Sequence, residues 1–407
     1  MYRELKWIGL IMQRMTLEAS DVSLASAVQR HEGHRLVGLD AARGILMLLG
    51  IVLHSANVYM IKPWRVHDAA PSMAFDYVNA AIHAFRMESF FWIAGFFAAM
   101  LIDRNKLSGY LGRRLVQLVL PLLATLATFN VVEYFIVTQF PSVTAARHEW
   151  IGHLWFLIDL VVFSLVLVPA LRQEGKAHRF LSKLVSGAHT PIELMASLAL
   201  ISALPAVVGA LVYRFAGVNL GAEILGLTSL ARLLNYAPYF AFGMLIHRSL
   251  RLRQLFGAVH PAWLIPGLTL QAWLAVNATE STSWTLLQIS MSALTWLNVA
   301  AVIALIDRCF VRPSRTTVWL ADAAYPIYLS HNVFVVGIGT ALLTVSLSVF
   351  AKFCLVLCLA TLASVLFHQL CRRSHWLHVL FSGRPGMPLP VRAQPPSATP
   401  LSLRSSA

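Results

Sequence analysis

The chain has 407 residues, of which 58% are hydrophobic and only 12% are charged, whereas soluble domains carry roughly 25% charged residues. This composition excludes a water-soluble globular fold and predicts an all-α polytopic membrane protein, with the lipid bilayer as its first partner. The net charge of +14 does not indicate a nucleic-acid partner, because Lys and Arg lie between apolar stretches and form no single basic face.

Apolar stretches recur along most of the chain and predict about ten transmembrane helices, with boundaries accurate to a few residues. The sixth and seventh stretches are the shortest. In chain order the stretches span residues 38–60, 78–102, 115–138, 150–170, 191–213, 229–247, 256–276, 284–306, 318–341 and 346–369.

Positive charge alternates between the connections that join these stretches. The amino-terminal segment, every second connection and the tail together hold 24 Lys and Arg residues, whereas the intervening connections hold only Lys62, Arg65, Arg147 and Arg214. Cytoplasmic connections of membrane proteins are enriched in Lys and Arg. Both termini are therefore expected in the cytoplasm, which requires an even number of helices and agrees with ten.

Three parts of the chain are expected. Residues 1–35 form a cytoplasmic amino-terminal segment, residues 36–370 form the transmembrane domain, and residues 371–407 form a mostly disordered cytoplasmic tail, rich in Pro, Ser and Ala. The first apolar stretch has no small-residue cleavage site after it, so we interpret it as a retained helix and not as a signal peptide. The expected location is the bacterial cell inner membrane, as a multi-pass protein.

Two ionisable side chains lie on one face of the first predicted helix. Arg43 and His54 are 11 residues apart, which corresponds to about 16 Å of rise and a net rotation of about 20°. Asp40, three residues before Arg43, can pair with it. Because an ionisable group inside a membrane costs about 2.5 kcal/mol or more, each of these residues needs a partner, an aqueous cavity or a function.

Further polar and ionisable side chains are expected at the depth of His54. His83 and Arg86 are three residues apart in the second predicted helix, His153 and Trp155 lie near the outer end of the fourth, and His331 lies in the outer half of the ninth. We therefore predict that four histidines and Arg86 gather in the periplasmic half of the membrane.

Such a cluster suits proton transfer to or from a hydroxyl group, because neutral imidazole is a base near ambient pH. Two alternatives remain: membrane histidines that only pack or form hydrogen bonds, and a metal site. We predict no metal site, because no carboxylate or His-x3-His pair stands at ligand spacing. The sequence also has no Gly-rich phosphate loop and no Gly-x-Ser-x-Gly motif, so nucleotide hydrolysis and serine-hydrolase chemistry are not expected.

Three motifs resemble those of the acyltransferase family 3 membrane proteins. Leu39-Asp-Ala-Ala-Arg-Gly44, with His54 after ten intervening residues, is similar to the family's Arg/Lys-x10-His signature. Phe90-Phe-Trp-Ile-Ala-Gly-Phe96 is similar to its second-helix element, and Tyr328-Leu-Ser-His331 to its late Tyr-Leu-x-His. The resemblance covers nearly all of residues 38–385 and implies a membrane-bound acyltransferase.

Within the family, four short segments in order resemble the glucans biosynthesis protein C branch, whose members attach succinyl groups to osmoregulated periplasmic glucans. They are Trp64–Ser72, Ile82–Met87, His153–Leu157 and Leu380–Pro385. This resemblance implies transfer of a succinyl group from cytoplasmic succinyl-CoA, a co-substrate, to glucan hydroxyls. No bound cofactor is implied, and other glucan-biosynthesis proteins are possible partners.

The resemblance also implies roles for the candidate residues. His54 is the expected general base for a glucan hydroxyl or a transient acyl carrier, and Arg86 is expected to pair with the free carboxylate of the succinyl group. The sequence departs from the family's Arg-x-x-Arg element, because Val116 and Gln117 stand where the second arginine is expected after Arg113 and Arg114. The predicted catalytic residues are His54, Arg43, His331 and His153. The predicted substrate-binding residues are Arg86, His83, Asp40, Trp155, Arg113 and Arg114. Of these residues, Arg43, Arg113 and Arg114 are expected to contact the phosphate groups of CoA.

Two other functions stay open from the sequence. An O-acetyltransferase that modifies another cell-surface or lipid-linked polysaccharide would keep the fold and change the substrates. A secondary transporter of an anionic or sugar substrate is an alternative from another class, although the internal repeats typical of transporters are not evident in the sequence.

Overall fold

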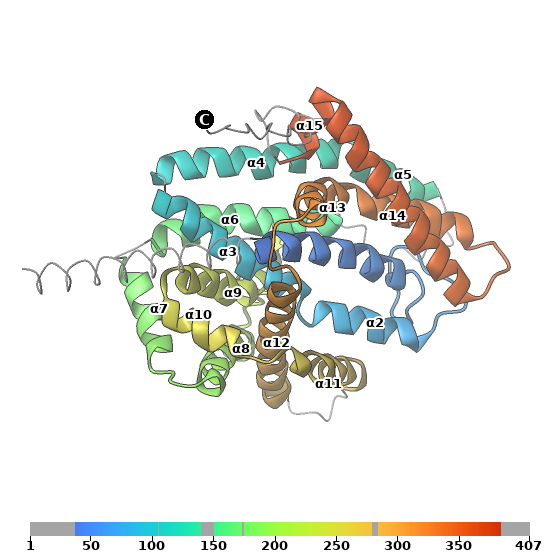
Figure 1. Cartoon of the computed structure of the whole chain (residues 1–407). Helices are drawn as coiled ribbons and strands as arrows, with labels where there is room; N and C mark the ends of the chain where they lie inside the picture. Colours follow the sequence, from blue (N-terminus) through green and yellow to red (C-terminus); the bar gives the residue numbers. More distant parts are fainter. Residues whose placement is uncertain (1–36, 105, 140–149, 173–174, 279–283, 384–407) are drawn as a thin grey trace, which may run out of the picture.

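The computed structural model describes residues 37–104, 106–139, 150–172, 175–278 and 284–383. Within these ranges the chain is almost entirely helical (Figure 1), as the composition predicts. The first described helix is Val37–Asn57. The other helices are α2 (Met73–His83), α3 (Arg86–Arg104), α4 (Leu107–Ala127), α5 (Phe129–Gln139), η1 (Gly152–Leu154), α6 (Trp155–Ala170), α7 (Lys176–Ser186), α8 (Pro191–Ala216), α9 (Leu230–Arg248), α10 (Leu250–Gly257), η2 (Pro261–Trp263), α11 (Leu264–Asn277), α12 (Trp284–Cys309), α13 (Arg315–Leu342), α14 (Val349–Arg373) and α15 (His375–Phe381).

Nine of the ten predicted stretches coincide with one helix or with two consecutive helices, and the seventh covers the end of α10, η2 and α11. Among the described residues, seven helical segments are long and apolar enough to cross a membrane. The three remaining stretches correspond to α9, α11 and α13. The helical membrane architecture is thus confirmed, whereas the count of ten crossings and the cytoplasmic location of both termini stay predictions.

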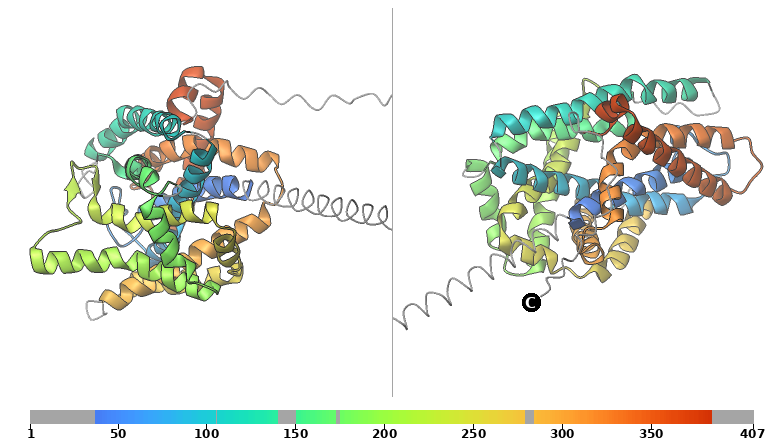
Figure 2. Two further views of the ribbon diagram at one scale, coloured as in Figure 1. Left: turned by 90° about the vertical axis from the view of Figure 1, so that its left-hand side faces the viewer. Right: turned by 45° about the horizontal axis from the view of Figure 1, so that its top comes forward.

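Two groups of helices lie on opposite sides of the bundle. Figures 1 and 2 show α14 and α15 on the side opposite to α7, α8 and α10. The short strands β1 (Glu223–Ile224) and β2 (Thr228–Ser229) form an antiparallel pair that leads into α9. The helix Val37–Asn57 runs through the middle of the bundle, and many of its side chains are buried.

Helices α3 and α9 pack with their backbones in contact. A Cβ atom on Gly95 would overlap the carbonyl oxygen of Phe240, and one on Gly243 would overlap that of Trp92. Small residues allow this close approach in membrane proteins, where helices associate through packing and not through exclusion of water. The Phe90–Phe96 motif therefore contributes a glycine that fixes the helix pair.

The second predicted helix is interrupted. The helix α2 ends at His83, two residues form a turn, and α3 begins at Arg86. The expectation that His83 and Arg86 share one helix face is therefore wrong, because a turn separates them; His83 is exposed and Arg86 is buried.

Buried ion pairs connect segments that are distant in the sequence. Lys352 of α14 donates to Asp68, which lies in the loop after the first described helix, at 2.8 Å, and both side chains are at most 7% exposed. Arg232 of α9 contacts Asp159 of α6 at 3.1 Å, and the Asp159 carboxylate also accepts a hydrogen bond from Thr228. Because breaking a buried pair leaves an uncompensated charge, these contacts hold the helices in register.

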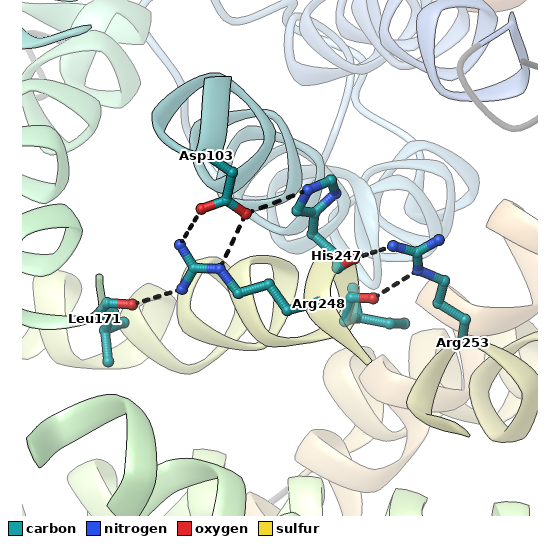
Figure 3. A network of polar contacts seen from close by, with 6 residues as sticks. Asp103, Leu171, His247, Arg248 and Arg253 are labelled. Carbon is teal, nitrogen blue, oxygen red and sulfur yellow. Dashed lines mark hydrogen bonds and ion pairs between the residues drawn. The ribbon is translucent and has the colours of Figure 1, made fainter. Parts of the chain in front are cut away.

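A polar network joins α3, α6 and α9 at the end of the bundle that carries Asp103. Arg248 donates to Asp103 at 2.8 and 3.2 Å and to the carbonyl oxygen of Leu171 at 2.9 Å (Figure 3). His247 lies 3.6 Å from the same carboxylate, and Arg253 donates to the carbonyl oxygen of Ile246. The network contains no predicted site residue, and its role is to tie these helix ends together.

The expected boundary between the transmembrane domain and the tail falls inside α14, which continues to Arg373 and is followed by α15. The expected amino-terminal segment 1–35 and the tail beyond residue 383 lie outside the described residues.

Candidate active site

Three of the four predicted histidines meet in the middle of the bundle. The ring centroids of His54 and His331 are 5.2 Å apart, those of His153 and His331 are 5.2 Å apart, and those of His54 and His153 are 6.3 Å apart. They come from the first described helix, from η1 and from α13. We call them the imidazole cluster.

The hydrogen bonds of His331 define its tautomer. Its Nδ1 lies 2.7 Å from the carbonyl oxygen of Tyr328 and 3.1 Å from that of Ile327. Because carbonyl oxygens only accept, Nδ1 carries the proton and Nε2 keeps a lone pair in the neutral ring. Among the described residues, Nε2 has no hydrogen-bond partner.

The other two imidazoles also keep nitrogen atoms available. Both ring nitrogens of His153 and Nδ1 of His54 are buried and lack a hydrogen-bond partner within the described part of the chain. Buried polar groups are usually satisfied, so a cluster of unsatisfied nitrogens needs an explanation such as a catalytic role or a bound molecule. The arrangement can accept and pass on protons.

The backbone around His153 is fixed by two contacts. Gly152 has φ of +52°, a left-handed conformation that favours glycine. A Cβ atom there would lie 2.8 Å from Nη2 of Arg65. The Tyr328 hydroxyl donates to the carbonyl oxygen of His153 at 2.8 Å. These contacts orient η1, so that the His153 ring faces α13.

Arg86 lies beside the imidazole cluster and is buried, with 4% of the residue exposed. Its Nε donates to the carbonyl oxygen of Leu46 at 3.1 Å. A Cβ atom on Gly50 would lie 2.7 Å from Arg86 Nη2 and 3.4 Å from His331 Nε2. The absence of a side chain at Gly50 therefore allows the guanidinium group to reach the imidazole cluster.

A cavity of about 740 Å³ adjoins the cluster on one side. We call it the polar cavity, because amide, hydroxyl and charged side chains line most of it. His83 lies in its wall, as does Trp64, whose ring stacks on His54 with centroids 5.8 Å apart. Trp64 thus connects the polar cavity to the cluster.

A smaller cavity of about 260 Å³ contains Arg43 and Arg114 in its wall, and we call it the arginine cavity. The rest of its lining is mainly apolar and includes Phe97 and Phe156. Arg43 lies 3.6 Å from Asp40, as predicted, and its guanidinium carbon lies 5.7 Å from the ring centroid of Phe97.

The helix Val37–Asn57 relates the two cavities. Met47 lines the arginine cavity and Asn57 lines the polar cavity, with Gly50 and His54 between them. Ten residues of helix correspond to about 15 Å of rise. The imidazole cluster and Arg86 therefore lie between the two cavities.

Trp155 and Arg113, two of the predicted substrate-binding residues, line neither cavity. The Trp155 ring stacks on Tyr236 at 5.3 Å and contacts the Arg232 guanidinium at 5.1 Å, so it belongs to the cluster around Asp159. Arg113 lies outside the lining of the arginine cavity and donates to the carbonyl oxygen of Gly109. Helix geometry explains both positions, because side chains one or two residues apart on a helix point in different directions.

A family model described as an acyltransferase domain matches residues 36–369. The chain belongs to the acyltransferase 3 family. It is similar to proteins named glucans biosynthesis protein C from Salmonella typhimurium, Salmonella typhi and Salmonella schwarzengrund, each 34% identical over 143 residues, which is 32% of this chain and 37% of the relative. The chain thus aligns with little more than a third of the length of these curated relatives. No solved structure matches the chain.

Membership of the acyltransferase 3 family and the apolar helices indicate a multi-pass membrane protein. One neighbour of the imidazole cluster, Glu133, was not singled out from the sequence. Glu133 binds both Arg65 and Asn332, and thereby supports the segments that carry His153 and His331. An acidic residue inside an apolar stretch is the signal that could have revealed it.

A metal site was the alternative to proton transfer that the sequence left open for the imidazole cluster. Among the described residues, no group of three or more His, Cys, Asp or Glu side chains is arranged to hold a metal ion. The candidate site offers imidazole bases and a guanidinium group beside two cavities.

Proposed function

We propose that the protein transfers a succinyl group from succinyl-CoA, bound in the arginine cavity, to a hydroxyl group of an osmoregulated periplasmic glucan bound in the polar cavity. The observation that carries the proposal is the position of the imidazole cluster between the two cavities. Support for the glucan comes from relatives named glucans biosynthesis protein C.

The acceptor would lie in the polar cavity. His54 is the imidazole whose ring stacks on a wall residue of that cavity, Trp64. We therefore assign His54 as the general base that removes the proton of the acceptor hydroxyl. The hydroxyl oxygen then bonds to the thioester carbonyl carbon, the carbon–sulfur bond breaks, and the CoA sulfur leaves as a thiolate that takes up a proton.

His331 and His153 would assist this proton transfer. The unprotonated Nε2 of His331 faces the cluster because its Nδ1 is held by two carbonyl oxygens. It can accept a hydrogen bond from the ring of His54 or from a water molecule between them. A two-step route, in which His54 briefly carries the acyl group, uses the same residues.

The donor would enter from the arginine cavity. Its volume of about 260 Å³ holds only part of the CoA molecule, so the rest of the donor would lie outside the cavity. Arg43 and Arg114 line this cavity and would attract the phosphate groups as charge-assisted contacts. The apolar side chains beyond them would contact the pantetheine arm.

Arg86 would recognise the succinyl group. It is buried beside His331 and Gly50, at the point where the acyl carbon must react. A dicarboxylic donor carries a free carboxylate, and a buried guanidinium group is a suitable partner for it. An acetyl donor has no group that needs this cation.

The deciding experiment is mass spectrometry of periplasmic glucans from a deletion strain with and without the gene. We expect succinylated glucan only when the gene is present. Unmodified glucan together with acetyl groups on another polysaccharide would favour the O-acetyltransferase alternative. Equal modification with and without the gene would contradict the proposal.

A further inference from the structure

Glu88 lines the polar cavity but has no role in the proposed acyl transfer. It stands in the first turn of α3, and its side chain lines the polar cavity. Its Oε2 atom is buried and has no hydrogen-bond partner among the described residues. In the same part of the chain its carboxylate takes part in no ion pair.

The buried acids of the described chain are all paired. Glu133 binds Arg65, Asp159 binds Arg232 and Asp68 binds Lys352. Buried polar atoms of folded proteins are usually hydrogen-bonded. Glu88 is partly buried, and its buried Oε2 atom is the exception that needs an explanation. Its position in a cavity wall indicates that the missing partner is a ligand.

The neighbours of Glu88 indicate the chemistry of that ligand. Amide side chains that can both donate and accept line the same cavity, among them Asn57, Asn79 and Asn235. Trp64 and Tyr239 add aromatic rings. Amides, a carboxylate and aromatic rings fit a ligand with many hydroxyl groups and apolar ring faces, whereas a lipid acyl chain requires an apolar lining.

We propose that Glu88 binds the carbohydrate acceptor by accepting hydrogen bonds from hydroxyl groups of one sugar ring in the polar cavity. This inference rests on the proposed function and deepens it, because it assigns the acceptor subsite. A carboxyl group keeps at least one oxygen that accepts hydrogen bonds in either protonation state. Glu88 holds the ring so that a neighbouring hydroxyl group faces His54.

The test uses purified full-length protein and glucan isolated from a strain that lacks the gene. For Glu88→Gln we expect the KM for glucan to rise about tenfold or more, because the amide replaces one accepting oxygen with a nitrogen that only donates. The KM for the acyl-CoA donor should stay unchanged. Direct binding of glucan without donor, measured by calorimetry, should weaken by the same factor. Glu88→Asp should restore part of the affinity.

Glu193→Gln is the matched control. Glu193 lies in the first turn of α8, is exposed and stands outside the polar cavity, and its carboxylate accepts a hydrogen bond from the backbone nitrogen of His189. A glutamine oxygen can still accept this bond, so the KM for glucan should not change. Glucan binding that is unchanged in Glu88→Gln would overturn the inference.

Unmodified protein provides an independent measurement if the variants do not fold. A water-soluble carbodiimide should label Glu88, and saturating glucan should protect it, whereas CoA should not. Labelling that is unaffected by glucan would overturn the inference. Protein that binds glucan through Glu88 but transfers no acyl group to it would contradict the proposed function alone.

Discussion

At the scale of single residues, the site depends on the atoms that His54, His153 and His331 leave without partners. Each ring comes from a different segment, and each keeps at least one nitrogen available. Their centroids lie within 6.3 Å of one another. A group of this kind moves protons only if the rings stay in place, which explains the contacts that fix Gly152 and Tyr328.

The first residue prediction concerns His54. The variant His54→Ala should lower acyl transfer by about 10²–10⁴-fold, the usual contribution of a general base, while membrane insertion stays intact. The measurement is acyl transfer from labelled donor to glucan in membranes, with expression checked by immunoblotting. The control is His375→Ala, because His375 is exposed on α15. Retained activity in His54→Ala would remove His54 from the mechanism.

The second residue prediction concerns Arg86. The variant Arg86→Ala should reduce transfer of succinyl groups more than transfer of acetyl groups, because only the succinyl donor has a carboxylate to pair with. The rates with succinyl-CoA and acetyl-CoA are compared in purified protein. The control is Arg113→Ala, whose side chain lies outside the lining of the arginine cavity. An equal loss with both donors would contradict the carboxylate role.

At the scale of helices, close packing and buried charge replace the exclusion of water that stabilises soluble bundles. The contact of α3 with α9 uses glycine on both helices. The contact between α14 and the loop after Asn57 uses the pair of Lys352 and Asp68. Both contacts support walls of the candidate site, because α3 lines both cavities and that loop carries Trp64.

The third prediction tests the contact of α3 with α9. The variant Gly243→Ala should lower the melting temperature in detergent, because the new methyl group overlaps the carbonyl oxygen of Trp92, and overpacking costs about 1–3 kcal/mol. Gly257→Ala is the matched control, since a Cβ atom there meets no atom within 4 Å. Equal melting temperatures for the two variants would show that the helices do not approach as described.

The fourth prediction tests the buried ion pair. Lys352→Met leaves Asp68 buried without its cation, which should cost about 3–5 kcal/mol of stability. The double variant Lys352→Met with Asp68→Asn should recover much of the loss, because asparagine can still accept the hydrogen bond from the backbone nitrogen of Ala70. Thermal unfolding followed by tryptophan fluorescence measures both. A double variant less stable than Lys352→Met would argue against the pair.

At the scale of the whole molecule, the two cavities lie toward different ends of the helix Val37–Asn57, with the imidazole cluster between them. The polar cavity is built from α2, α9, α11 and α12, and the arginine cavity from α4, α6 and α13, while the first described helix and α3 contribute to both. Under the proposed function this arrangement is a route that would let a donor and an acceptor meet without leaving their own compartments.

The fifth prediction tests this route by cysteine accessibility. In a background in which the four native cysteines are replaced, Asn79→Cys in the polar cavity should react with an impermeant maleimide added from the periplasmic side. Ala321→Cys in the arginine cavity should react only in inverted vesicles. Labelling of both positions from the same side would show that the cavities do not open to opposite compartments.

The sequence by itself determined the class of fold, the pairing of Arg43 with Asp40 and the position of Arg43 and His54 on one helix, because hydropathy and helical spacing act locally. It also indicated that His153 and His331 belong near His54, since alternating helices bring residues of similar depth together. The motifs that resemble the acyltransferase 3 family led to a family that the domain match confirms.

Tertiary structure alone decided which side chains face each cavity. It separated His83 from Arg86 by a turn, placed Trp155 with Arg232, and left the Oε2 atom of Glu88 without a hydrogen-bond partner among the described residues. The physical reason is that depth in a membrane follows from position along a helix, whereas the direction of a side chain depends on where helices break and rotate against their neighbours. Those breaks and rotations result from packing between segments far apart in the chain, which no local pattern encodes.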